Sequence, residues 1–543
     1  MNVKTKAISL LAASLLIISA FAGCSTSTNE NSQGAQSVES ASNTEADATS
    51  TREELIFVNY RDIRDLNPHL YAGEMYAQEM LYETLVTITA DGYAPCLAES
   101  WEVSEDGRVY TFKIREGVAF SDGEVCDAHA IQANFNAILE NKDRHTWLEM
   151  MQLLESAEAV DDYTFRITMS EPYYPMLTEL GVTRPFAMIS PKAMTDGSTK
   201  DGVGAYIGTG PYILSDFITD EYAVFEVNEN YWGDIPAIKK ITVKVIPDNQ
   251  TRILALQNRE FDLIFGKNMI DAEAINQFSG SEEFSVALSE ATSTRQIVLN
   301  TNNTILSDIA VRRALQHATN KAAISEGIFY GLETPADTLF ADTVPYCDIG
   351  LKPYEYNMES AASILEEAGW TDNGGVREKD GQKLELSLLY NSDSVTEKTI
   401  AEYLQSEYAK LGISLSIHGE EEQSYRDNMK AGNFEMVFNI CWGMPYDPQS
   451  SLAAMRQPVY GDYAAQLGLE DKAVIDEAIT SVLTSTDEDE RQELYAFVLT
   501  RLHEDAVYIP LTYECNKAVY RSDLQGVTFT QSQYEVPFPG MYY

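Results

Sequence analysis

The stretch "NKDRHTWLEM", residues 141–150, places Arg144, His145 and Trp147 in one short run. A guanidinium can clamp a carboxylate with two parallel donors, and an indole can form an apolar wall beside it. The same residues also fit a structural reading, in which Arg144 and His145 are solvated on a helix and Trp147 packs in the core. The rest of the chain has to distinguish these two interpretations.

The charge of the chain limits what it can bind. Its 543 residues include 84 acidic and 38 basic side chains, for a formal net charge of -46 at pH 7. Such a surface repels phosphate backbones and anionic lipid headgroups, which argues against nucleic-acid binding and electrostatic membrane docking. Arginines that gather in a cleft of so acidic a protein are therefore candidates for ligand binding.

Motifs typical of enzymes and of metal sites are missing from the sequence. It contains no GxSxG, no HExxH and no Walker loop, and we predict that the protein is not an enzyme and has no resident cofactor. The histidines show neither HxxxH nor HxH spacing, which favours surface or structural roles for them. Apart from Cys24, the cysteines are odd in number and form no CxxC pair, so neither a disulfide framework nor a zinc site is indicated.

The N-terminus has the pattern of an export signal. Lys4 and Lys6 precede the apolar stretch "AISLLAASLLIISAFAG", which suits a signal peptide better than a membrane span. It ends in "FAGC", which resembles a bacterial lipobox, with Phe21 in place of the usual leucine. We predict a signal peptide at residues 1–23, lipid on Cys24, and a disordered polar tether over residues 24–50. The body would then lie outside the cytoplasm, at the cell surface or in the periplasm.

The body mixes strands and helices. Period-two alternation predicts half-buried strands in "VYTFKIR", "TFRITM" and "KITVKVIPD". Helical spacing predicts a helix in "DAHAIQANFNAIL", with Asp127 as its N-cap, and another in "EKTIAEYLQSEYAKLG", with Gly412 as its stop before the strand "ISLSI". This order of elements indicates an α/β fold.

The order of several motifs resembles a known family. "LNPHL", "LYETLV", "GTGPYIL", "NENYWGD", "AVRRALQHATNKAAI" and "LHEDAVYIPLTY" resemble, in that order, the large substrate-binding proteins of ABC importers for peptides and nickel, family 5. "RHTWLEM", "TRPFAMISP", "ADTLFADTVPY" and "WGMPYDP" are most similar to its nickel-binding branch. The resemblance covers essentially the whole mature chain.

The resemblance implies a two-lobed periplasmic-binding-protein-like fold, class II and of the large peptide-binding type, with an extra subdomain in the first lobe. We place the first lobe at residues 51–291 and 512–543 and the second lobe at residues 292–511. The strands "RQIVLNTN" and "YIPLTYE" would connect the lobes and allow a hinge motion.

The resemblance also implies site residues. It gives Arg184 the principal carboxylate-binding role and Arg144 a supporting one, while Trp147 and Trp442 would form the walls of the pocket. Three further positions match the pocket of that branch: Tyr71, Met75 and Tyr446. The structural alternative for each is a core aromatic or, for "WGMPYDP", a simple turn.

One position departs from the branch. Where its best-known pattern has a metal-binding histidine after "MRxP", this chain reads "MRQPVYGDY", with Tyr460 at that position. A neutral phenol is a poor nickel ligand compared with imidazole. Either the chelator supplies every donor atom and the protein has no direct metal ligand, or the transported ligand is not a nickel complex.

The resemblance implies capture of a nickel chelate of small carboxylates or histidine, and delivery of it to the permease and ATPase subunits of an ABC importer. We expect a monomer that is attached to the membrane only through its lipid. An oligopeptide- or dipeptide-binding protein of an ABC importer is the alternative, because it would share the fold, the signal and the tether.

Overall fold

The long β-sheet of the molecule connects segments far apart in the sequence. The computed structural model describes residues 52–89, 92–372, 374–441 and 448–543, and Thr51–Tyr543 form one compact unit. Within the described residues the main sheet has eleven strands. One of them, β15 (Thr334–Pro335), pairs with β21 and lies outside the linear order of the others. The order of neighbouring strands in the sheet is β10 (Tyr212–Ile218), β11 (Tyr222–Val227), β12 (Lys240–Val245), β1 (Glu54–Asn59), β13 (Leu263–Phe265), β21 (Tyr508–Arg521), β14 (Phe284–Leu299), β20 (Met436–Cys441), β18 (Glu385–Asn391) and β19 (Ser414–Glu420).

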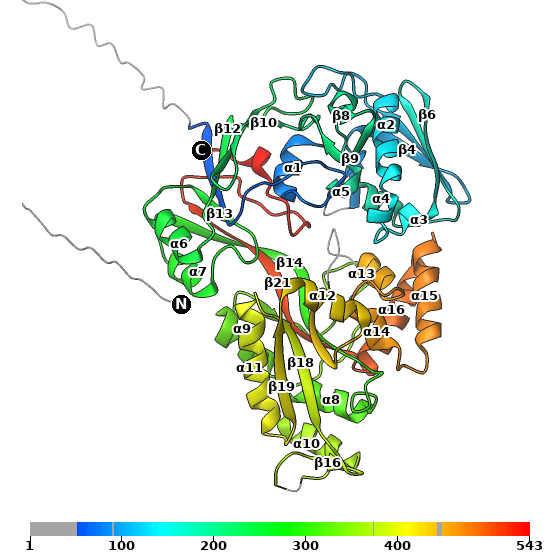
Figure 1. Ribbon diagram of the computed structural model, residues 1–543, viewed down its shortest axis with the longest axis vertical. Coiled ribbons are helices and arrows are strands. Elements are labelled where there is room, and N and C mark those ends of the chain that lie inside the picture. The colour runs from blue at the N-terminus through cyan, green and yellow to red at the C-terminus, as the bar shows by residue number, and fades with distance from the viewer. Residues whose placement is uncertain (1–51, 90–91, 373, 442–447) are drawn as a thin grey trace, which may run out of the picture. The chain divides into compact units, whose positions relative to one another are not determined.

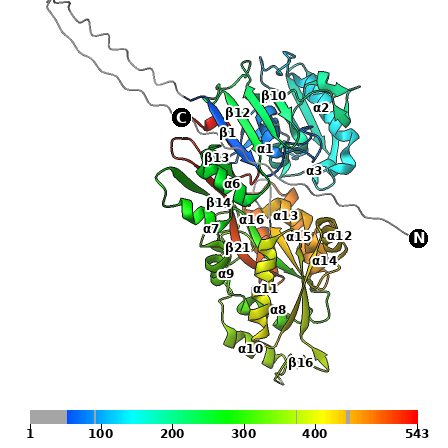
Figure 2. The ribbon, with the colours of Figure 1, turned by 60° about the vertical axis from the view of Figure 1, so that its left-hand side comes forward.

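The two longest strands, β14 and β21, pair antiparallel and pass through the centre of this sheet. They run from α6 (Asn249–Gln257) and α7 (Ala272–Phe278) to α8 (Ile309–Ala318) and α11 (Val395–Ala409), as Figures 1 and 2 show. The segments predicted to connect the lobes, residues 295–302 and 508–514, fall largely on these strands, although β14 already ends at Leu299. The predicted lobe boundaries stay a prediction.

A separate four-stranded sheet lies in the N-terminal half. Its order is β4 (Ala98–Val103), β5 (Val109–Ile114), β7 (Thr164–Met169) and β6 (Leu154–Asp161), all antiparallel. The predicted alternation is confirmed in β5 and β7, whose apolar residues are buried at every second position. In β12 the pattern holds for Ile241 and Val243, whereas Val245 at the end of the strand is only half-buried.

Helix ends follow the predicted signals. α2 (Ala128–Glu140) begins after Asp127, whose carboxylate accepts a hydrogen bond from the Ala130 amide at 2.9 Å. After α11, Gly412 takes a φ of +71°, and a Cβ there would lie 2.8 Å from the Gly375 carbonyl oxygen. Glycine is required here for both reasons, and it turns the chain into β19 as predicted.

The remaining elements complete the body. Small antiparallel pairs are β2 (Val86–Thr89) with β3 (Gly92–Pro95), β8 (Met194–Thr195) with β9 (Ser198–Val203), and β16 (Glu378–Lys379) with β17 (Gln382–Lys383). Other helices are α1 (Met75–Leu81), α3 (Met150–Leu153), α4 (Met176–Leu180), α5 (Thr183–Phe186), α9 (Lys321–Phe329), α10 (Met358–Glu367), α12 (Glu422–Ala431), α13 (Pro448–Ala454), α14 (Gly461–Gln466), α15 (Lys472–Thr484) and α16 (Glu488–Glu504).

None of the helices in the described ranges is long and apolar enough to cross a membrane.

Candidate functional site

A pocket of about 390 Å³ gathers most of the predicted ligand-binding residues. Of the eight predicted positions, Tyr71, Met75, Arg144, Trp147, Arg184 and Tyr460 line it, whereas Trp442 and Tyr446 lie outside the described residues. The complete lining is Arg61, Tyr71, Gly73, Glu74, Met75, Arg144, Trp147, Arg184, Tyr460 and Tyr534. Residues from distant parts of the chain therefore meet at one site.

Arg184 is held by neutral oxygen atoms. Its Nε donates to Gln78 Oε1 at 2.6 Å, and its two terminal nitrogens donate to the backbone carbonyls of Tyr71 and Gly73. No carboxylate of the described residues pairs with it. Burial lowers the pKa of Arg184, but a guanidinium stays protonated in proteins, so the pocket contains a fixed positive charge that makes no direct ion pair with the described residues.

Arg144 adds a second positive charge. It ends a short 3-10 helix, Lys142–Arg144, and its exposed side chain makes no hydrogen bond or ion pair with the described residues. A third arginine, Arg61, differs because its Nε pairs with Glu74 Oε1 at 2.5 Å. Three arginines and one glutamate thus line a pocket in a chain with a net charge of -46, which favours an anionic ligand.

An aromatic wall faces these arginines. Trp147 Nε1 donates to the Tyr71 hydroxyl at 2.8 Å, and that hydroxyl lies 2.6 Å from His145 Nδ1. Burial raises the pKa of Tyr71 to about 12. Burial, and then the neighbouring Arg144, lowers the pKa of His145 to about 4. Both side chains are therefore neutral at pH 7, and the wall can contribute hydrogen bonds but no charge.

Sequence reasoning missed Arg61, Gly73, Glu74 and Tyr534 of the lining, and it assigned no role to the supporting His145. Arg61 follows the end of β1, and a charged residue after the end of a parallel strand is a usable signal for a site. Glu74, which pairs with Arg61, directly precedes α1. Tyr534 follows β21 in "QSQYEVPFPG", a segment without a motif. Tyr534 reaches the pocket because the C-terminal segment returns to α1. A local sequence pattern does not show this long-range course of the chain.

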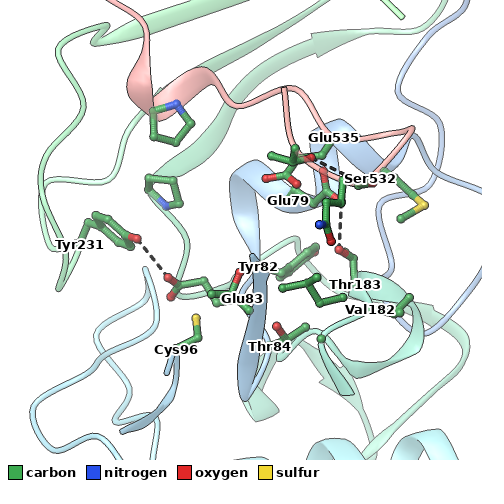
Figure 3. Close-up of a pocket in the computed structure, with 18 residues that line it drawn as sticks. Glu79, Tyr82, Glu83, Thr84, Cys96, Val182, Thr183, Tyr231, Ser532 and Glu535 are labelled. Carbon is green, nitrogen blue, oxygen red and sulfur yellow. Dashed lines mark hydrogen bonds between the residues drawn. The ribbon is translucent and has the colours of Figure 1, made fainter. Parts of the chain in front are cut away.

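A second cavity, of about 230 Å³, adjoins the first and shares Met75 with it. Figure 3 shows Glu79, Glu83 and Glu535 among the residues around it. Glu83 accepts hydrogen bonds from Trp232 Nε1 at 2.7 Å and from the Tyr231 hydroxyl at 3.1 Å. Burial, and then the neighbouring Glu535, raises the pKa of Glu79 well above its ordinary value. With carboxyl groups and no basic side chain in its lining, this cavity does not suit an anion.

The described residues contain no group of three or more His, Cys, Asp and Glu side chains placed to hold a metal ion. Tyr460 precedes α14, and burial raises the pKa of its phenol above the ordinary value, so it is neutral at pH 7. A metal that enters this pocket therefore has to bring donor atoms with it, or find them outside the described residues.

The mixed α/β fold with one basic ligand pocket defines a solute-binding protein, and comparison with known proteins agrees. Residues 92–462 match the model for bacterial extracellular solute-binding proteins, family 5 Middle, and the chain belongs to this family. It is 42% identical over 482 residues to the nickel-binding periplasmic protein of Escherichia coli, covering 88% of this chain and 92% of that protein. It is 25% identical over 502 residues to the dipeptide-binding protein of E. coli, covering 87% and 91%.

A solved structure is similar throughout the body. The crystal structure of NikA from Brucella suis in complex with Fe(III)-EDTA superimposes with a TM-score of 0.88 at 47% identity, covering 90% of this chain and 99% of that one. The predicted family and the predicted two-lobed fold of the large peptide-binding type are confirmed. The four-stranded sheet and α2 lie within the predicted first lobe, and the extra subdomain as a separate unit stays a prediction.

Proposed function

We propose that this protein captures nickel as a chelate with small carboxylates or histidine and delivers it to the permease and ATPase of an ABC importer. The observation that carries the proposal is the charge of the pocket, where Arg144 and Arg184 make no ion pair with the described residues. Carboxylates of a chelate would occupy both guanidinium groups, and a guanidinium binds a carboxylate with two parallel donors. The similarity to a nickel-binding protein and to a protein crystallised with Fe(III)-EDTA supports a metal chelate over a peptide.

The chelate supplies the metal ligands in this proposal. Tyr460 replaces the imidazole that we expected from the branch, and a neutral phenol binds nickel weakly. The protein then recognises the outer carboxylates and the shape of the complex. Its role is binding without chemical conversion of the ligand.

Isothermal titration calorimetry tests the proposal. We expect tight binding of nickel with excess L-histidine, and weak or no binding of nickel alone or L-histidine alone. Dipeptides and tripeptides without metal are titrated in the same way, because they are the ligands of the alternative function. Tight binding of a peptide, with none of the nickel–histidine complex, would establish the alternative peptide-binding function instead.

We also propose that the protein is exported as a monomer and tethered by lipid on Cys24, outside the described residues. The N-terminal sequence pattern supports this part of the proposal. Cys24→Ser should remove the lipid attachment point and release the body from the membrane fraction. Fractionation with an immunoblot measures this, and continued retention of the variant in the membrane would instead favour an uncleaved signal helix.

A further inference from the structure

His145 is completely buried, and Nε2 of its ring has no hydrogen-bond partner among the described residues. Its other ring nitrogen, Nδ1, lies 2.6 Å from the hydroxyl of Tyr71, which lines the ligand pocket. No pattern in the sequence assigns His145 a role. Its geometry places it behind the wall of the pocket, where it can act only through Tyr71.

We propose that His145 is a positioning residue: with its proton on Nδ1, it donates to the Tyr71 hydroxyl together with Trp147, and this turns the Tyr71 proton toward an anionic ligand. The proposal rests on the proposed function for the ligand, while the position of the histidine proton is a property of the protein alone. Through this arrangement His145 would select ligands that accept a hydrogen bond.

Counting donors and acceptors supports this assignment. A tyrosine hydroxyl has one donor and two acceptor positions, and an indole nitrogen can only donate. Trp147 Nε1, at 2.8 Å, therefore occupies one acceptor position of Tyr71. If His145 Nδ1 also donates, both acceptor positions are filled and the Tyr71 proton is left for the pocket. If Nδ1 carries no proton, the Tyr71 hydroxyl donates its hydrogen bond to Nδ1, and the pocket loses a hydrogen-bond donor.

The burial of Nε2 favours the first arrangement. With the proton on Nδ1, Nε2 is a bare acceptor, and with the proton on Nε2, the protein buries an N–H without a partner. Among backbone groups, orphaned buried N–H donors are rarer than incompletely satisfied acceptors, and we apply the same preference to the ring. An anion between Arg144 and Arg184 adds to this preference, because it attracts the hydroxyl proton of Tyr71.

Nitrogen NMR of the wild-type protein with 15N-labelled histidine reads the proton position directly. We expect at pH 7 that His145 has a protonated Nδ1 and a bare Nε2, with its signals assigned by their loss in His145→Asn. A proton on Nε2 would overturn the proposal. This measurement needs no ligand, so it remains decisive if the protein binds no nickel complex and the proposed function fails.

Calorimetry with the nickel–L-histidine complex then tests whether His145 acts through Tyr71. We expect Tyr71→Phe to weaken binding roughly tenfold, equivalent to about 1.4 kcal/mol. His145→Leu should weaken it less, and His145→Asn, whose amide can donate near the Nδ1 position, should largely retain it. The double variant Tyr71→Phe, His145→Leu should bind no more weakly than Tyr71→Phe alone. Additive losses in the double variant would contradict the proposal, because His145 would then contribute independently of the hydroxyl.

Discussion

At the scale of single residues, the site depends on where a positive charge has been left without a partner. Many lysines and arginines of the described residues form ion pairs, as Arg295 does with Glu514, and Arg61 pairs with Glu74 even inside the pocket. Arg184 instead directs its donors to an amide and two backbone carbonyls. These contacts fix the guanidinium without a direct ion pair to the described residues, so a carboxylate of the ligand can pair with it.

Removing Arg184 should therefore weaken chelate binding most. We expect a loss of about 2–5 kcal/mol in binding free energy for Arg184→Ala, since a buried carboxylate of the ligand would lose its partner, and a smaller loss for the exposed Arg144→Ala. Arg184→Lys keeps the charge but not the planar fork, so we expect an intermediate loss. Calorimetry measures these effects, with Arg166→Ala as control, because this partly exposed arginine lies beside Glu158 on the separate four-stranded sheet. An Arg184→Ala variant with wild-type affinity would refute the assignment.

The presence of a phenol at Tyr460 leads to a prediction about how the affinity for nickel depends on the chelator. In the wild type, affinity for nickel should appear only when a carboxylate chelator or histidine is added. Tyr460→His should place an imidazole in the pocket lining and relax that requirement, because imidazole can replace one donor of the chelator. X-ray absorption on both complexes, prepared with a chelator that lacks histidine, reports nickel-bound imidazole. Such a signal in the wild type would reveal a protein ligand that we have not identified.

These residues were predicted through the resemblance to the nickel-binding branch, which rests on local motifs of this sequence. "RHTW" and "TRPF" each combine arginine with an aromatic residue, and the structure brings both to one pocket. Glu74 and Tyr534 could not be found in this way, since their types are common and only the fold places them there. His145 could be noticed but not interpreted, because its role depends on a contact with a residue far away in the sequence.

At the scale of elements, the strands β14 and β21 contain a buried ionic network. Arg295 on β14 pairs with Glu514 on β21, while Glu333 lies 3.6 Å from Arg295 and 3.3 Å from Lys517. Lys267 lies 3.6 Å from Glu514. Burial raises the pKa of Glu514, but Arg295 and Lys267 outweigh this effect and hold that pKa at about 2. The network therefore joins the two long strands at the middle of the sheet.

Breaking this network should destabilise the protein in a pH-dependent way. We expect Glu514→Gln to lower the free energy of unfolding by about 3–5 kcal/mol at pH 7, because the buried Lys267 loses its carboxylate partner and Arg295 retains only the more distant Glu333. The folded-state pKa of Glu514 is depressed, so its contribution is present above the unfolded-state value and is lost as pH falls from about 4.5 toward 2. Urea unfolding should show the difference between wild type and variant shrinking in that window.

The control for this prediction is Asp523→Asn, which breaks an exposed pair with Arg521. We expect it to cost at most about 1 kcal/mol. A similar effect of both substitutions would mean that the buried network adds nothing beyond a surface ion pair.

Secondary structure was predictable where the signal lies within a few neighbouring residues. Asp127 caps α2, and the alternation in β5 and β7 is the one that the sequence shows. The pairing of strands was not predictable in this way. β1 pairs in parallel with β12 and β13, far along the chain, and the register of β14 on β21 is shifted at several points. Such pairings depend on long-range packing, which no local period records.

At the scale of the whole molecule, the predicted lobes also meet away from the two long strands. Tyr174, in the first lobe, donates its hydroxyl to Glu488 Oε1 at 2.5 Å and its amide to the Leu483 carbonyl at 2.9 Å. The Arg491 guanidinium lies 3.4 Å from the centre of the Tyr174 ring. Glu149, close to Trp147, pairs with Arg456 of the second lobe. Arg144 and Arg184 of the predicted first lobe and Tyr460 of the predicted second lobe line one pocket, so we expect these contacts to stabilise the arrangement that forms it.

Weakening these contacts should weaken ligand binding without touching the pocket. Tyr174→Phe removes the hydroxyl bond to Glu488, and Tyr174→Ala also removes the ring beneath Arg491. If the lobes separate about β14 and β21, each variant raises the population of the open form, and the apparent Kd rises by the factor that the binding-competent fraction falls. We expect roughly a two- to tenfold weaker apparent affinity for Tyr174→Phe, and more for Tyr174→Ala. Calorimetry would measure the affinity, and small-angle X-ray scattering would show a larger radius of gyration for the ligand-free variants that reverts when the chelate binds.

Tyr222→Phe, which removes a hydroxyl bond to Asp216 within the first lobe, is the matched control and should change neither the affinity nor the radius of gyration. An unchanged affinity and radius in Tyr174→Ala would show that these contacts do not govern closure, and that the two long strands alone fix how the lobes meet.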